Sequence, residues 1–460
     1  MARPPAAGAP STFTDIDAID AVCRQVIEPS VADETEIVWF ERRSGRAELG
    51  DDEGDLAATD DRAEALPATE FTRTILLRVV EAGRPGWHRT HIADAGELGA
   101  GLRQALAVAT VQQKAPRLPV LPVPGDAAPQ AIDALRDARV DRLDVPSARA
   151  LLAGWRHPGE TARLRWSATR LAVHNSHGVR RAVATTEVEL ELERGPSRVA
   201  TAARSLDGLG LDRLAERCRG RSAATETSSA PLETTSLPAV FAPEAVIDLL
   251  DVLNVFAFAG RSYLDGTSFL SRHRGVQVFD PRIHLRDDGG DPRGLPFPFD
   301  LEGSPKRAID LVVDGRPSTL ALDQLQSARA GLEPTAQSVG GRDALFGNLF
   351  LRPGDATLAD LLQAVGDGLW IGGLDQIECL DPTKLEVRAV ARDVRRIRAG
   401  VAAERLPHLV WQQSLLGLLA RLREVGREPV VRTMPSTPLG AISAPALAVE
   451  SLERFALRSS

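Results

Sequence analysis

Histidine is a frequent zinc ligand, and two histidine pairs in this chain have a spacing of three residues. They are His88/His91 and His174/His177. A zinc site needs three or four nitrogen, sulfur or oxygen ligands that converge on one tetrahedron. Neither pair has a cysteine or a carboxylate at a recognised spacing. We therefore interpret both pairs as surface or turn histidines rather than as metal ligands.

Closely spaced carboxylates are a second group that could do chemistry, because general acid/base catalysis uses such side chains. The candidates are Asp287/Asp288 and Asp300/Glu302. Turn or loop acids are the plainer interpretation, since glycine and proline are frequent around them. Cys379 follows a β-prone run, where a cysteine is more often a small buried hydrophobe than a nucleophile.

The common catalytic signatures are missing from the sequence. It contains no H-E-x-x-H, no G-x-S-x-G and no P-loop, the motifs of metal-assisted, serine and phosphate chemistry. Its cysteines, Cys23, Cys218 and Cys379, are odd in number and far apart, which fits neither a disulfide framework nor a clustered zinc site. The sequence predicts no cofactor in this chain.

Charge and hydropathy exclude two classes of partner. A net charge of -8 argues against a nucleic-acid partner, which would require a concentrated basic surface. The most hydrophobic stretch, residues 246–259, is interrupted by Asp248 and Asp251 and is shorter than the roughly 20 residues that cross a bilayer. Residues 1–11 lack the apolar core of a signal peptide. We expect a soluble, cytoplasmic protein without a membrane span.

The periodicity of apolar residues indicates the main elements. Helices are expected at residues 15–29, 95–113, 242–258 and 409–425. In the stretch 182–193, valine and leucine alternate with glutamate, which predicts a half-buried strand with one wet face.

The chain is too long for one core, because single cores stop growing near roughly 250 to 300 residues. We predict an α+β fold: two smaller α/β units with mainly antiparallel sheets, followed by a β-rich C-terminal domain. The acidic segment 51–64 is expected to be an exposed loop, and the stretches 116–129 and 221–236 are expected linkers. The predicted parts are a disordered tail (1–14), an N-terminal α/β domain (15–115), a central α/β domain (130–220) and the C-terminal domain (237–455).

The motifs of residues 242–354 occur in an informative order. They include Pro298-Phe299-Asp300, then Glu302-Gly303-Ser304-Pro305, then Asn348-Leu349 with Arg352-Pro353-Gly354. In this order they resemble the core of the TldD/PmbA peptidase family. Upstream, Leu77-Arg78-Val79 and the stretch 174–178 are similar to the first two domains of that family, so the resemblance spans about residues 15–450.

The resemblance also implies which type of subunit this is. Family members of the TldD type carry a helix with His-Glu-x-x-x-His and a later cysteine, which together hold zinc. Here the corresponding helix, 242–258, has no histidine, and the stretch 433–447 has no cysteine. The resemblance therefore implies a non-catalytic subunit of the TldE (PmbA) type, with zinc on a TldD-like partner in a heterodimer.

The implied substrate is an unfolded or short peptide, which the heterodimer degrades or matures in a closed cavity. A ribosomally made natural-product precursor is one such substrate. By the resemblance, the candidate residues lining the peptide channel are Asp300, Glu302, Gly303 and Asn348.

Two other functions stay open at this point. One is a stand-alone peptide-binding or scaffold protein on the same fold. The other is a zinc-independent enzyme that uses Asp300, Glu302 or Cys379. A neighbouring gene for a His-Glu-x-x-x-His paralogue would favour the heterodimer, whereas activity retained without Cys379 or Asp300 would count against the zinc-independent enzyme.

Overall fold

The computed structural model describes most of the chain. The described residues are 12–50, 69–125, 132, 135–222, 226–227, 236–341, 343–437, 439–453 and 455–457. The acidic segment 51–64, nearly all of the N-terminal tail and most of the second expected linker lie outside the described residues, so those three predictions are not addressed.

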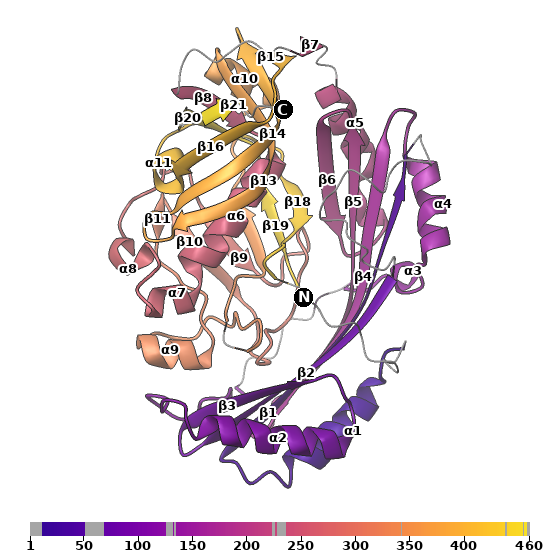
Figure 1. Ribbon diagram of the computed structural model, residues 1–460, viewed down its shortest axis with the longest axis vertical. Coiled ribbons are helices and arrows are strands. Elements are labelled where there is room, and N and C mark those ends of the chain that lie inside the picture. Colours follow the sequence, from indigo (N-terminus) through magenta and orange to yellow (C-terminus); the bar gives the residue numbers. More distant parts are fainter. Residues whose placement is uncertain are drawn as a thin grey trace.

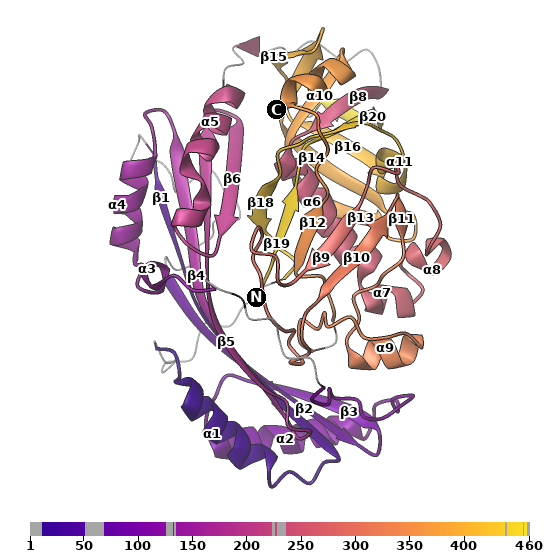
Figure 2. The same ribbon diagram turned by 180° about the vertical axis from the view of Figure 1, so that it is seen from behind.

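The first half of the chain builds one antiparallel six-stranded sheet with the order β3-β2-β1-β4-β5-β6. Figures 1 and 2 show this long sheet curving around the C-terminal half of the molecule. Its strands are β1 (Glu34–Leu49), β2 (Thr69–Glu81), β3 (Arg84–Thr90), β4 (Thr161–Asn175), β5 (Arg180–Arg194) and β6 (Ser197–Ala203).

Two separate hydrophobic cores form on this one sheet. At one end, α1 (Ile16–Ile27) and α2 (Ala95–Ala109) pack over β1 and β2. At the other end, α3 (Ala138–Asp141), α4 (Val145–Trp155) and α5 (Leu211–Ser222) cover β4, β5 and β6. The sheet is continuous, because β1 pairs with β4 along most of its length. The two expected α/β units thus share a sheet, and their boundaries stay a prediction.

The first two helices form where the apolar spacing predicts them. In α1 the residues Ile19, Cys23 and Val26 are buried along one stripe, and Asp15 caps the helix by accepting a hydrogen bond from the amide of Asp17. Asp94 caps α2 in the same way, through the amides of Gly96 and Glu97. Both caps satisfy amide groups that the first turn of a helix leaves without partners.

The C-terminal half is β-rich and contains two sheets. A six-stranded sheet has the order β11-β10-β9-β12-β19-β18. A nine-stranded sheet has the path β17-β20-β8-β13-β14-β15-β7, with β16 and β21 attached through β14. The strands are β7 (Glu226–Thr227), β8 (Ser236–Phe241), β9 (Leu285–Asp288), β10 (Ala308–Val313), β11 (Arg316–Pro317), β12 (Asn348–Leu351), β13 (Gly368–Asp381), β14 (Glu386–Arg398), β15 (Val401–Arg405), β16 (Leu409–Ser414), β17 (Leu422–Val425), β18 (Val430–Thr433), β19 (Ala441–Ala444), β20 (Leu447–Glu453) and β21 (Phe455–Leu457).

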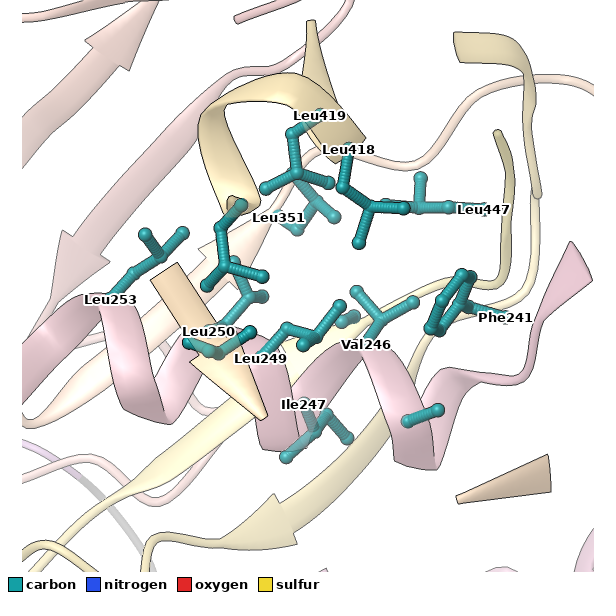
Figure 3. Close-up of a cluster of buried hydrophobic side chains, with 14 of the residues drawn as sticks. Phe241, Val246, Ile247, Leu249, Leu250, Leu253, Leu351, Leu418, Leu419 and Leu447 are labelled. Carbon is teal, nitrogen blue, oxygen red and sulfur yellow. The ribbon is translucent and has the colours of Figure 1, made fainter. Parts of the chain in front are cut away.

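Helix α6 lies at the centre of this half, where it contacts both β13 and β19. Its leucines pack against Leu351, Leu418, Leu419 and Leu447 in the core that Figure 3 shows. Burying one such side chain stabilises the fold by about 1.5–3 kcal/mol. The helices of this half are α6 (Pro243–Leu253), continued by a π-helical turn (Asn254–Phe258), α7 (Gly260–Leu264), α8 (Leu270–His273), α9 (Gln324–Ala330), α10 (Leu358–Val365) and α11 (Leu415–Leu419).

The helix expected at residues 409–425 is wrong. Residues 409–414 form strand β16, only residues 415–419 are helical, and strand β17 follows. Alternate residues of β16, including Trp411, are buried against β14, with which the strand pairs. The leucines that suggested one helical stripe belong to two elements, Leu415, Leu418 and Leu419 to α11 and Leu422 to β17. The predicted fold class is confirmed: the fold is α+β, mainly antiparallel and β-rich at the C-terminal end.

No helix in the described part of the chain is long and apolar enough to span a membrane.

Candidate functional site

A cleft of about 480 Å³ lies between the six-stranded sheet and the segment that follows β18. One wall comes from β1, β2, β4 and β5, and the other comes from residues 432–440. The lining residues are Arg42, Ser44, Gly45, Arg46, Glu70, Arg165, Trp166, Glu187 and Glu189 on the sheet, and Arg432, Thr433, Met434, Pro435, Thr437 and Gly440 opposite.

Arginine and glutamate side chains alternate across the sheet wall. Neighbouring strands place such residues side by side, because every second side chain of a strand points to the same face. Arg42 of β1 lies 2.8 Å from Glu187 of β5, measured from Nη2 to Oε1. Arg165 of β4 is in register with Glu189 of β5 and forms an ion pair with it. The wall is therefore highly polar but nearly balanced in charge.

The expected wet face of β5 is wrong for part of the strand. Glu189 is only 2% exposed, because the segment after β18 covers it. Its Oε2 atom accepts hydrogen bonds from the amide and hydroxyl groups of Thr433, at 2.8 and 2.6 Å. Burial alone would raise the pKa of Glu189, but Arg432 and Arg165 outweigh burial and hold that pKa below its usual value.

Arg432 connects this wall to helix α6. Its Nη1 atom lies 3.5 Å from Oδ1 of Asp248, and it also interacts electrostatically with Glu189. Oδ2 of Asp248 accepts a hydrogen bond from the amide of Leu374 at 3.1 Å. Burial raises the pKa of Asp248 to about 6, although Arg432 and Arg392 act to lower it.

Two further carboxylates of α6 are held by other elements. Glu244 is 1% exposed and forms ion pairs with Arg217 and Arg221 of α5, the latter at 2.9 Å. Burial opposes the charge of Glu244, yet the two guanidinium groups lower its pKa to about 2. Asp251 accepts a hydrogen bond from the hydroxyl of Ser436. The spacing of Glu244, Asp248 and Asp251 places all three on one side of α6.

These residues do not fit a zinc ion. The polar side of α6 presents three carboxylates and no histidine, and each carboxylate is already engaged by arginine, serine or a backbone amide. Over the described ranges, no three histidine, cysteine, aspartate or glutamate side chains converge so that they could hold a metal. The pair His174/His177 makes other contacts: His177 Nε2 lies 2.9 Å from Glu34 and His174 Nδ1 lies 3.5 Å from Asp20. His174 is buried in β4, so the expected surface or turn position is wrong for this residue.

The four candidate channel residues occupy two buried places. Asp300, Glu302 and Gly303 lie together in the segment between β9 and β10, whereas Asn348 begins β12. Asp300 accepts hydrogen bonds from the amides of Glu302, Ser304 and Ser338 at 3.0, 2.9 and 3.0 Å. None of the four lines the cleft described above, and their assignment to a peptide channel stays a prediction.

Gly303 and Asn348 have evident structural roles. Gly303 has a φ of +78°, and an added Cβ would lie 2.6 Å from Cγ1 of Val179. The Asn348 side chain accepts a hydrogen bond from the amide of Leu295 and donates to the carbonyls of Asp288 and Asp291. These contacts hold the segment between β9 and β10 in place.

The residues named for zinc-independent catalysis all lie away from the cleft. Burial raises the pKa of the Cys379 thiol to about 11, so the nucleophilic thiolate is scarce at neutral pH. Asp300 and Glu302 are 3% and 2% exposed and do not reach the cleft.

The sequence analysis missed the cleft arginines, Arg42, Arg165 and Arg432. A signal existed for Arg165 alone, because charged residues alternate with apolar ones in β4 and β5, which places Arg163 and Arg165 beside Glu191 and Glu189. Alternation predicts that such side chains share a face, but it does not tell which other segment covers that face.

Comparison with known proteins supports the resemblance that the motifs suggested. The model of the PmbA/TldA metallopeptidase C-terminal domain matches residues 234–454. Among curated proteins, no sequence matches this chain.

Several solved structures are similar over nearly the whole chain. TldE from Thermococcus kodakarensis is 19% identical with a TM-score of 0.76, over 96% of this chain and 99% of that one. A candidate modulator of a DNA gyrase from Thermotoga maritima is 17% identical with a TM-score of 0.74, over 96% and 98%. A candidate modulator of DNA gyrase from Bacteroides thetaiotaomicron is 16% identical with a TM-score of 0.70, over 96% and 97%. At these identities the likeness establishes a shared fold.

Proposed function

Because residues 234–454 match the PmbA/TldA metallopeptidase C-terminal domain and the chain shares the fold of TldE, we propose that it is the non-catalytic, TldE-like subunit of a heterodimeric zinc metallopeptidase of the TldD/PmbA family. Its partner is a TldD-like subunit that carries the zinc. The complex acts on unfolded or short peptides, and maturation of a ribosomally made natural-product precursor is the narrower form of this proposal.

The observation that carries the proposal is the chemistry of α6. Metallopeptidases use the ion to polarise the scissile carbonyl and to activate water. The corresponding helix of a TldD-type subunit supplies two histidines, whereas α6 supplies Glu244, Asp248 and Asp251. Ion pairs and hydrogen bonds engage all three carboxylates within this chain. A chain built in this way depends on its partner for metal chemistry.

The cleft supports a role in holding peptide. Thr433 and Thr437 line the cleft together with the apolar side chains of Met434 and Pro435. Hydroxyl groups and apolar side chains suit an extended peptide of varied sequence, because they can contact backbone and side chains without demanding one charge. In the complex, this cleft would form part of the wall of the closed cavity.

The test is peptide hydrolysis by this chain alone, by its TldD-type partner alone and by the two chains purified together. We expect cleavage of an unfolded protein substrate by the pair and none by this chain. Cleavage by the isolated chain would refute the proposal. If the chain binds the same peptides but never associates with the partner, the stand-alone binding protein is the correct function.

A further inference from the structure

Four carboxylates and one arginine cluster in the interface between the six-stranded sheet and the C-terminal half, and two of the carboxylates pair with the arginine. Glu36 lies on β1 and Arg78 on β2, while Glu302 and Asp300 come from the segment between β9 and β10. Asp323 is the N-cap of α9. All five side chains belong to buried residues.

Arg78 is the centre of this cluster and bridges the two halves of the molecule. Its Nη2 atom lies 3.0 Å from Glu36, within the same sheet. Its Nη1 atom lies 2.6 Å from Oε1 of Glu302, in the other half. The second carboxylate oxygen of Glu302 accepts a hydrogen bond from the amide of Gln324 at 3.1 Å, which ties α9 to the same point.

The two aspartates add negative charge beside this bridge. Asp300 is fixed by three backbone amides, and Asp323 accepts a hydrogen bond from the amide of Gln326 at 2.7 Å. Burial and the charge of Glu302 raise the pKa of both aspartates above the usual range. Burial also raises the pKa of Glu36, although Arg78 opposes that shift.

The other charged groups nearby do not neutralise the excess. Lys306 interacts electrostatically with Asp300, but its ammonium group donates to Gln337, which in turn donates to Asp287 at 2.7 Å. Arg181 of β5 contributes a methylene contact near Gly303. Further along β1, Glu34 is paired with His177 at 2.9 Å. Only Glu36 and Glu302 pair with Arg78 directly, whereas Asp300 and Asp323 interact with the charge of Glu302. In a poorly hydrated interface the four carboxylates cannot all be ionised at low cost.

Catalysis is a poor use for this cluster, because none of its members lines the described cleft. The direct consequence of its protonation is structural. The same segment packs Phe297, Phe299 and Leu301 against Val38 and Leu171 of the sheet. A charge change at Glu36 or Asp300 thus acts on the contact between the two halves.

We propose that Glu36, Asp300, Glu302 and Asp323 form, around Arg78, a proton-dependent lock between the six-stranded sheet and the C-terminal half. When the cluster holds at least one proton, the lock is closed. When its last shared proton leaves, repulsion between the carboxylates loosens the contact of the segment between β9 and β10 with β1 and β2.

The sign of the pH dependence follows from the raised pKa values. Carboxyl groups in the unfolded chain ionise near pH 4, so the folded cluster binds protons that the unfolded chain has already lost. Its contribution to stability is complete below about pH 4 and is lost as the pH rises through the raised pKa values of the folded state. The lock therefore loosens on the alkaline side.

The experiment measures the free energy of unfolding from about pH 6 to pH 9, the range in which buried carboxyls can titrate. Hydrogen exchange of β1 and of the segment between β9 and β10 is followed over the same range. For the natural chain we expect stability to fall and exchange to rise with pH. In Glu36→Gln the number of protons released on unfolding should fall by about one, which flattens the curve.

Glu187→Gln is the matched control, because Glu187 pairs with Arg42 outside the cluster. The free energy of unfolding of this variant should change with pH in the same way as that of the natural chain. If Glu36→Gln does not fold, Asp323→Asn decides the question, since asparagine also caps helices well. The proposal is overturned if every folded cluster variant keeps the alkaline slope of the natural chain.

Discussion

Gly45 is a single residue on which one wall of the cleft depends. It lies in β1 opposite Trp166 of β4, and an added Cβ would lie 2.2 Å from Cζ2 of the indole ring. Trp166 is 3% exposed and belongs to the core under α3, α4 and α5. The ring can occupy this place only because position 45 has no side chain.

We expect Gly45→Ala to destabilise the fold by about 1–3 kcal/mol, the usual result of overpacking a core. Chemical denaturation measures the effect. Gly154→Ala is the control, because Gly154 lies in α4 with open space around its Cβ position. There alanine should stabilise the helix by about 0.5–1 kcal/mol. Equal stability of Gly45→Ala and the natural chain would show that Trp166 repacks freely.

The sequence drew attention to some acidic residues, but it indicated neither their surroundings nor the arginines of the cleft. Asp300 and Glu302 were found as closely spaced acids, yet Arg78, the partner of Glu302, is 224 positions away in the chain. Local patterns do not carry such contacts. For the same reason, the sequence did not indicate the electrostatic interaction between Arg432 and Glu189 at one side of the cleft.

Helix α6 shows how one element sets the chemistry of its surroundings. Pro243 stands in the first turn, where a missing amide hydrogen does no harm, and the helix expected from residue 242 begins there. The next residue, Glu244, is held by Arg217 and Arg221 of α5. The ion pairs thereby join the six-stranded half of the molecule to the C-terminal half.

The lowered pKa of Glu244 predicts a loss of stability in acid. Its folded pKa of about 2 lies below the unfolded value, so its contribution is complete above about pH 5 and is lost as the pH falls toward 2. Glu244→Gln should destabilise the protein by about 3–5 kcal/mol at neutral pH, because Arg217 and Arg221 lose their partner. At acidic pH the free energy of unfolding of the variant should approach that of the natural chain. Unfolding curves at several pH values test this.

The exposed glutamate Glu378 provides the control for this prediction. It pairs with Arg388, and both side chains are about half exposed. Glu378→Gln should change stability by no more than about 1 kcal/mol at any pH. If Glu244→Gln behaves like Glu378→Gln, the ion pairs of α6 do not stabilise the interface.

Elements with one clear period were predicted well, and composite ones were not. Helices α1 and α2 lie where the apolar spacing placed them. The helix predicted at residues 409–425 was wrong because two strands flank a helix of only five residues. Leu422 of β17 happens to continue the helical spacing of the leucines in α11. The prediction that the glutamate face of β5 is exposed to solvent was wrong for another reason. Its alternation is correct, but a segment about 240 residues later covers Glu189.

At the scale of the whole molecule, one sheet joins parts of the chain that the sequence separates into two units. Strand β1 pairs with β4, and the two helical cores occupy opposite ends of the same sheet. Composition and linkers could suggest the units, but pairing between distant strands could not be foreseen from either. This shared sheet forms the wall that faces α6 and the cleft.

The match of residues 234–454 to the PmbA/TldA metallopeptidase C-terminal domain and the carboxylates of α6 lead to the central proposal, that this chain relies on a partner for zinc. The most direct measurement is the zinc content of the chain purified alone and of the chain purified with a TldD-type partner, each after equilibration with zinc. The account predicts stoichiometric zinc in the complex and only traces in the isolated chain. One tightly bound zinc ion per isolated chain would contradict it.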